Sequence, residues 1–181
     1  MRTCLLILLL CAPCLAAQSW STATADTVLW LHPGTGQNSG QGPAFFPANV
    51  KGLPSPLARD TVPVTDPRQV CSIGLGGELV LGFTSSVVID GPGPDFTIFE
   101  NAFRYLNNRI YAEPVRVEVS RDGVTWHAFP FDSVTLKGCA GITPTSGKDP
   151  FDPAVSGGDS FDLSEIGVDS VRWIKMVDVT Q

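Results

Sequence analysis

The chain has 181 residues with 12 basic and 18 acidic side chains, and its formal net charge is −6 at pH 7. This length suits one domain with a sizeable core and is short for two. The acidic balance argues against nucleic acid and anionic membrane surfaces as partners, because both are negatively charged, and it is compatible with divalent cations.

Residues 1–17 have the three parts of a secretory signal peptide. Arg2 is the positive start, Leu5 to Leu10 form the apolar centre, and Leu15-Ala16-Ala17 is the cleavage site. The apolar centre is shorter than the roughly 20 residues that span a bilayer. We therefore expect an exported protein, secreted or at the cell surface, whose mature chain has no transmembrane segment.

Two of the five cysteines, Cys71 and Cys139, lie outside the signal peptide. An even pair in an oxidising compartment is typical of a disulfide, which would stabilise the fold by roughly 4 kcal/mol through closure of a long loop. The spacing alone does not show that the two residues are close. Two separate buried thiols are therefore an equal alternative.

Residues 18–68 are rich in Gly, Pro, Ser and Asn and have few strand signals. Asp26–Leu31 is predicted as an edge strand that ends at His32-Pro33-Gly34. We expect the rest to pack on or beside the core as an irregular segment, with disorder as the alternative.

Strand signals recur at regular spacing over residues 69–181. Val115–Ser120 alternates valine with polar residues, and Asp122-Gly123 after it is a strong hairpin signal. The other predicted strands are Glu78–Phe83, Val87–Ile89, Phe96–Phe99, Trp126–Phe129 and Val171–Val177. No window has a sustained helical period, so the pattern predicts an all-β fold, an antiparallel β-sandwich.

Two acidic stretches are candidate calcium sites. The first is the turn Asp90-Gly-Pro-Gly-Pro-Asp95, which its glycines and prolines make stiff. Calcium takes six to eight oxygen ligands from carboxylates, amides and carbonyls. The candidate ligands of this first stretch are Asp90, Asp95, Glu100 and Asn101. The second stretch is the acidic loop Gly157-Gly158-Asp159 with Asp162, whose candidate ligands are Asp159 and Asp162. Alternatively the aspartates cap turns through backbone amides, while Glu100 and Asn101 hold a neighbouring loop.

Catalytic patterns are weak. Gly158-Asp159-Ser160 is superficially similar to the nucleophile block of the hydrolases named for Gly-Asp-Ser-Leu, but it lies in an all-β context and Phe161 follows. The chain has two histidines and no Gly-x-Ser-x-Gly elbow. Glu100 and Glu113 are a carboxylate pair of the kind that glycoside hydrolysis uses. We expect a protein that is not an enzyme, with a glycoside or ester hydrolase as the weaker alternative.

Several motifs resemble known proteins. Val117–Trp126 and Val171–Met176 are similar to the galactose-binding-like jelly roll of discoidin and coagulation-factor type C domains. A larger set, from about Val70 to Asp178, resembles a family of exported bacterial cell-surface proteins. Its motifs are Ser72–Gly77, Gly93–Phe103, Ala112–Pro114, Cys139–Gly141 and Gly157–Leu163.

The resemblance implies a jelly roll in which calcium often braces a loop at one end and loops hold carbohydrate. The loop residues suited to such a ligand are Arg104, Tyr105, Asn107, Asn108, Arg109 and Tyr111, because aromatic rings stack on sugars while amide and guanidinium groups bond hydroxyls. The implied role is adhesion or carbohydrate binding, with a glycan or another surface protein as partner. An ordinary polar hairpin loop, in a purely structural or assembly module, is the alternative.

Members of that family continue past the position of Asp178 through a further Asp-containing strand, whereas this sequence stops at Gln181. We therefore expect the domain over residues 69–181 to be truncated at its C-terminus. An absent strand would leave an unpaired sheet edge, which favours aggregation.

Overall fold

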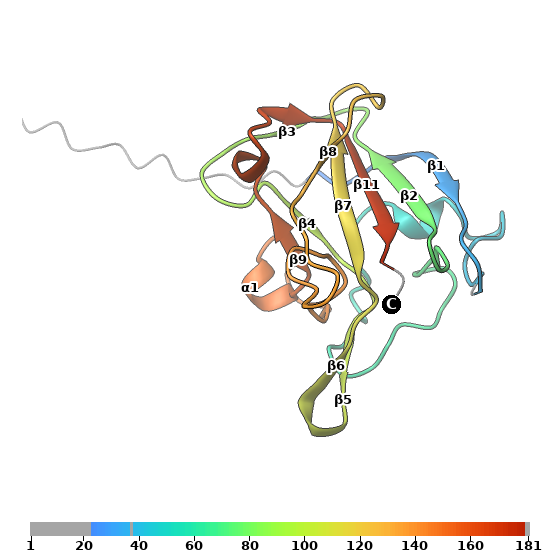
Figure 1. Cartoon of the computed structure of the whole chain (residues 1–181). Coiled ribbons are helices and arrows are strands. Elements are labelled where there is room, and N and C mark those ends of the chain that lie inside the picture. Colours follow the sequence, from blue (N-terminus) through green and yellow to red (C-terminus); the bar gives the residue numbers. More distant parts are fainter. Residues whose placement is uncertain (1–22, 37, 180–181) are drawn as a thin grey trace, which may run out of the picture.

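A computed structural model describes residues 23–36 and 38–179, so the expected signal peptide lies outside the described residues. The described chain forms eleven strands, one four-residue helix and three 3₁₀ turns, and its strands pair antiparallel (Figure 1). The prediction of an antiparallel β protein is confirmed. No helix in the described ranges is long and apolar enough to cross a bilayer.

The largest sheet has five strands in the order β1-β2-β11-β7-β8. Their bounds are β1 (Thr27–His32), β2 (Glu78–Gly82), β11 (Trp173–Asp178), β7 (Val115–Ser120) and β8 (His127–Ala128). Leu79 pairs with Met176, and Met176 pairs with Val117, so one apolar row crosses the three central strands. Since side chains alternate along a strand, this row marks the inner face of the sheet.

Short strand pairs cover that inner face (Figure 1). β3 (Val88–Ile89) pairs with β10 (Ser170–Val171), and β4 (Phe96–Ile98) pairs with β9 (Asp159–Phe161). Their buried side chains join those of the five-stranded sheet in one hydrophobic cluster, which includes Ile98, Phe161, Val171, Val117, Val119 and Ile174. The valines of β7, which alternate with polar residues in the sequence, therefore point into the core.

Residues 103–111 form a hairpin instead of the predicted loop. β5 (Phe103–Tyr105) pairs with β6 (Arg109–Tyr111) around a 3₁₀ turn (Leu106–Asn108), and the hairpin projects from the body of the protein (Figure 1). Asn107 and Asn108 have φ of 59° and 60°. Asparagine tolerates this left-handed region better than most residues, which is why the chain can reverse within the three residues between Tyr105 and Arg109.

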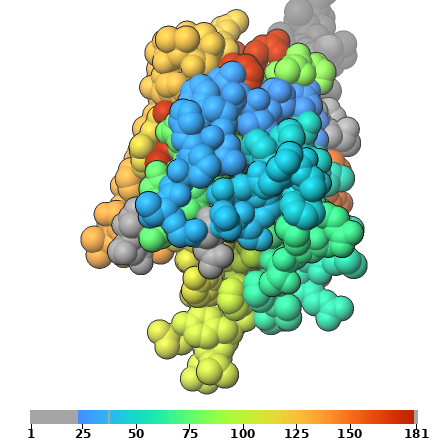
Figure 2. Space-filling view, turned by 90° about the vertical axis from the view of Figure 1, so that its right-hand side faces the viewer, coloured from blue at the N-terminus to red at the C-terminus, as the bar shows by residue number. Residues whose placement is uncertain are grey.

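The stretch between β1 and β2 contains a 3₁₀ turn (Ala48–Val50) and isolated bridges, among them Thr35 with Leu75. The described part of residues 33–77, which we call the covering segment, lies across one face of the molecule, in cyan and green (Figure 2). The Asn49 amide ties it together by donating to the backbone carbonyls of Gly40, Pro67 and Val70 at 2.8–3.0 Å. Val50 and Phe46 pack against the core.

The last predicted strand is divided into two strands in the structure. Residues 171–177 divide at Arg172 between β10 and β11, which belong to different sheets. Two further elements follow β8: helix α1 (Pro153–Ser156), capped by the Asp152 carboxylate, and a 3₁₀ turn (Leu163–Ile166), capped by Asp162. β11 has strand partners on both sides, β2 and β7, so the unpaired edge expected from an absent strand does not lie beside it.

Candidate functional site

Three of the predicted calcium ligands meet at one end of the short strand pairs. Carboxylate oxygens of Asp90, Asp95 and Asp162 lie within 4.8 Å of one another. Asp90 and Asp95 bracket the Gly-Pro-Gly-Pro turn, in which Gly93 has a φ of 87°. Asp162 follows β9, and β9 pairs with β4, which begins directly after Asp95. The strand pairing therefore brings a distant aspartate to the turn.

Hydrogen bonds fix two of these carboxylates. Asp95 accepts from the backbone N–H of Gly91 and of Leu163, both at 2.8 Å, and Asp162 accepts from Ser164 at 2.9 Å. These contacts agree with the turn-capping alternative, and they leave further lone pairs on each carboxylate. Partial desolvation and the negative charges of Asp95, Asp162 and Asp169 raise the pKa of Asp90. The cluster is thus electrostatically suited to a cation.

The other three predicted ligands lie apart from this cluster. The Asn101 side chain accepts from the Val64 N–H at 2.8 Å and donates to the Val64 carbonyl at 3.0 Å. It therefore holds the covering segment, as in the alternative in which Asn101 holds a neighbouring loop. Asp159 accepts from the N–H groups of Ile142 and Thr143 at 3.1 and 3.3 Å. Glu100 lines a cavity behind the sheet. Glu100, Asn101 and Asp159 therefore lie outside the cluster that Asp90, Asp95 and Asp162 form.

All six predicted ligand-binding residues lie on the β5–β6 hairpin. Tyr105 and Arg109 pair across it, and the Arg109 guanidinium lies 5.6 Å from the centre of the Tyr105 ring. Phe103 stacks on Tyr111 with ring centres 5.2 Å apart. These four side chains share one face of the hairpin because residues two apart on a strand point the same way. Tyr105 and Tyr111 are 40% and 50% exposed, so the face is open to solvent.

The remaining three residues have structural contacts. Arg104 lies on the other face, where its side chain is 3.8 Å from the Asp60 carboxylate and 3.5 Å from the Asn108 side chain. Asn107 and Asn108 form the turn itself. The surface available for a ligand is consequently the aromatic face, which we define as Phe103, Tyr105, Arg109 and Tyr111.

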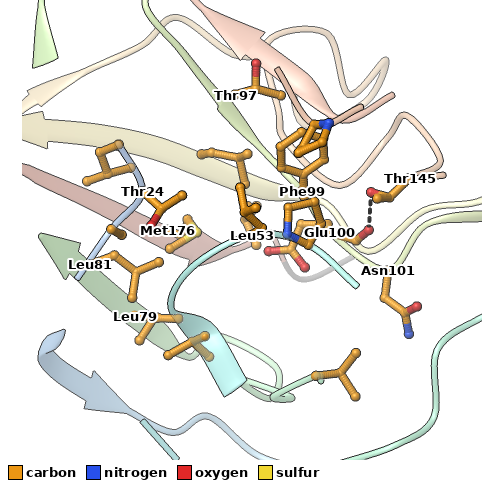
Figure 3. Close-up of a pocket in the computed structure, with 18 of the residues that line it drawn as sticks. Thr24, Leu53, Leu79, Leu81, Thr97, Phe99, Glu100, Asn101, Thr145 and Met176 are labelled. Carbon is orange, nitrogen blue, oxygen red and sulfur yellow. Dashed lines mark hydrogen bonds between the residues drawn. The ribbon is translucent and has the colours of Figure 1, made fainter. Parts of the chain in front are cut away.

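A cavity of about 1750 Å³ lies between the inner face of the five-stranded sheet and the covering segment. Leu79, Leu81 and Met176 form its apolar wall, and Leu53 lies opposite (Figure 3). The sequence did not predict this cavity, because it arises where an irregular segment of low apolar content covers an apolar sheet.

Glu100 projects into this cavity from the end of β4, while its backbone carbonyl accepts from the Thr145 hydroxyl at 2.8 Å (Figure 3). Desolvation, with the nearby charges of Glu113 and Asp159, raises the pKa of Glu100 to about 8. Desolvation and the charge of Asp178 also raise the pKa of Glu113, whose residue is exposed at the cavity rim. From the sequence, Glu100 and Glu113 were paired only as a catalytic candidate. The contribution of the Asp178 charge to their raised pKa values was not predicted.

Cys71 and Cys139 are separate free thiols, so the structure has the second of the two alternatives and the predicted bridge is absent between them. Burial, together with the charge of Glu100, raises the pKa of Cys71 to about 11. Burial also raises the pKa of Cys139. Both thiols are therefore poor nucleophiles at neutral pH.

The residues weighed for catalysis have structural partners. The Ser160 hydroxyl lies 2.9 Å from that of Thr97 across the β4–β9 pair. His32 bonds Glu78 at 2.8 Å and stacks on Trp30, on the outer face of the large sheet. His127 lies on β8, as predicted for a strand residue.

No protein-family model and no curated protein matches the chain. The resemblance to exported bacterial cell-surface proteins therefore stays a prediction, and the site has to be argued from its own geometry.

Proposed function

We propose that the chain is an exported, non-catalytic module of the cell surface, with a galactose-binding-like jelly roll, that binds carbohydrate through the aromatic face of the β5–β6 hairpin. The observation that carries this proposal is the open ladder of Phe103, Tyr111, Tyr105 and Arg109 on a projecting element. Aromatic faces stack on the apolar side of a sugar ring, and the Arg109 guanidinium supplies hydrogen-bond donors for its hydroxyls.

A glycan array tests this role. We expect the wild-type chain to bind at least one class of glycan, and the Tyr105→Ala and Tyr111→Ala variants to lose most of that binding. Phe131→Ala is the matched control, because Phe131 is 40% exposed but lies outside the hairpin. Binding that survives both tyrosine substitutions would refute the aromatic face as the contact.

A second partner is supported by the tip of the same hairpin. Leu106 is 81% exposed and Ile110 is 41% exposed, and exposed apolar side chains on a projecting element favour contact with another protein. If no glycan binds, we expect the Leu106→Ser and Ile110→Thr variants to weaken binding to a surface protein. This would make the chain an assembly module.

Calcium is part of the proposal as a structural ion held by Asp90, Asp95 and Asp162. Three carboxylates without nitrogen or sulfur ligands match the preference of calcium for oxygen, and waters would complete the coordination. The ion would offset the mutual repulsion of these groups and brace the turn between β3 and β4.

The calcium hypothesis has a direct test. At a calcium concentration about 100-fold above Kd, we expect a gain of about 2.7 kcal/mol in unfolding free energy and a rise in Tm of roughly 5–10 °C over a chelator control. Asp162→Asn should abolish the rise while keeping an oxygen to cap Ser164. Glu165→Gln, an exposed acid nearby, is the control. An unchanged Tm for the wild-type chain would remove calcium from the proposal.

A further inference from the structure

The cavity behind the five-stranded sheet has an apolar wall and an acidic end. Leu79 and Leu81 of β2 and Met176 of β11 form the wall, and the sheet holds them in place through its two central pairings. The cavity exceeds the roughly 300–1,000 Å³ of ordinary small-molecule sites, so it has room for a ligand with a long apolar body.

Carboxylates gather at the other end. Glu100 points toward Leu53 and away from Thr145, with Asn101 beside it (Figure 3). Glu113 lies at the rim just before β7, and Asp178 at the end of β11 also lines the cavity while it accepts from the Gly76 N–H at 2.8 Å. Asp159 at the start of β9 adds a fourth negative charge near Glu100, and Cys71 of the covering segment lies near it as a neutral thiol.

No cationic side chain is among the groups that set the protonation of Glu100. The charged groups that act on it are all carboxylates. Lys51, Arg59 and Arg68 also line the cavity, but none of them is among the charges that act on Glu100, and Arg68 pairs with Asp66 at 3.0 Å. A partly buried carboxylate surrounded by like charges stays protonated or takes a counter-ion. The cavity therefore has a place for one positive charge beside an apolar wall.

We propose that this cavity binds an amphiphilic organic cation, whose ammonium group lies against Glu100 and Glu113 and whose alkyl body lies along Leu79, Leu81 and Met176. A metal ion suits the site less well, because these carboxylates do not belong to the group of acidic residues that could share one ion. An anion would meet repulsion from every carboxylate at the acidic end. This ligand is independent of the glycan on the hairpin.

Binding should be coupled to proton release. At pH 7 the Glu100 carboxyl is about nine-tenths protonated, since its pKa is about 8, and a bound cation requires the ionised form. The complex should therefore release close to one proton at pH 7. Affinity should rise about tenfold between pH 7 and pH 9, where Glu100 is already ionised in the free protein.

Titration calorimetry with octyltrimethylammonium, which carries its charge at every pH, is the experiment. We expect saturable binding of this probe and none of octanoate, its counterpart of opposite charge. Measurements in two buffers of different ionisation enthalpy give the proton count for the wild-type chain, so this readout needs no variant. Glu100→Gln should weaken binding about tenfold at pH 9 and remove the pH dependence, whereas Glu165→Gln should change neither.

Equal binding of octyltrimethylammonium and octanoate would overturn the proposal, as would no binding of either. Binding without proton release at pH 7 would overturn the role of Glu100. Tyr105 does not line the cavity, whereas Tyr111 does. Loss of glycan binding in the Tyr105→Ala variant should therefore leave these measurements unchanged, so the two proposals fail separately.

Discussion

Glu118 is a charged residue near the middle of the five-stranded sheet, yet it is only 8% exposed. It lies on the outer face, paired with Lys175 of the neighbouring strand at 2.5 Å and in contact with Arg116. Lys175 also lies 4.4 Å from the centre of the Trp126 ring. The two cations thus compensate the Glu118 carboxylate for its lost hydration, and the Trp126 indole in turn packs against Lys175.

Removal of the lysine should be costly. We expect Lys175→Met to destabilise the fold by roughly 2–4 kcal/mol in urea unfolding, because it leaves a buried carboxylate with Arg116 as its remaining partner. Adding Glu118→Gln should restore part of the loss, since the uncompensated charge then disappears. Lys137→Met, at an exposed position, is the control. If it costs as much as Lys175→Met, the ion pair is not the cause.

At the scale of elements, the covering segment depends on one side chain. Asn49 donates to three carbonyls that lie far apart in the segment, and Gly40 leaves room for it, because a Cβ there would lie 2.7 Å from the Asn49 amide nitrogen. The segment thus has a fixed shape without regular secondary structure.

We expect Asn49→Ala to lower the free energy of unfolding by about 1–3 kcal/mol, because buried carbonyls lose their donor. Limited proteolysis should then cut residues 33–77 faster. Asn38→Ala, an exposed asparagine in the same segment, should leave both readouts unchanged. Equal proteolysis of the two variants would contradict the anchoring role of Asn49.

The elements with strong local signals were predictable. Strict alternation located β7, and Asp122-Gly123 located the turn into β8, where Asp122 accepts from Val124 and Thr125 at 2.8 Å. β9 was missed because its three residues, Asp159-Ser160-Phe161, include only one apolar side chain and follow two glycines, so no apolar run marks the strand. Asn107 and Asn108 are residues that tolerate positive φ, so the pair is a turn signal for this hairpin.

The candidate sites divide in the same way. Asp90 and Asp95 belong to one turn, so their proximity could be predicted from the sequence. Asp162 lies in a different acidic loop, and the pairing of β9 with β4 is what brings it to the turn. Glu100 was grouped with the turn because it lies close to it in sequence and carries the same type of oxygen ligand. Only the packing of β4 against the covering segment decides that it turns into the cavity instead.

At the scale of the whole molecule, the cavity acids should make stability depend on pH. The pKa of Glu100 is raised in the folded state from an ordinary value of 4.5 to about 8, and that of Glu113 is also raised. The folded state therefore holds these protons more tightly than the unfolded state. Their contribution is fully present below about pH 4.5 and is lost as the pH rises through 8.

We expect the Tm of the wild-type chain to fall between pH 5 and pH 9, by an amount that corresponds to a few kcal/mol. Glu100→Gln should flatten this profile, whereas Glu165→Gln should keep it. The lowered pKa of Asp122, about 2, and that of Asp132 act in a different window, because their contribution is present above about pH 4 and lost in acid. A flat wild-type profile from pH 5 to pH 9 would contradict the burial of Glu100.

Because β11 is the central strand of the five-stranded sheet, it determines when during synthesis the sheet can form. Residues 173–178 join β2 to β7, which are separated by 32 residues along the chain and do not pair with each other. While a ribosome has not yet released those residues, β1–β2 and β7–β8 can exist only as two separate ribbons, each too small to be stable in water. The five-stranded sheet can therefore form only after residues 173–178 have been synthesised, and until then its other strands stay without a common partner.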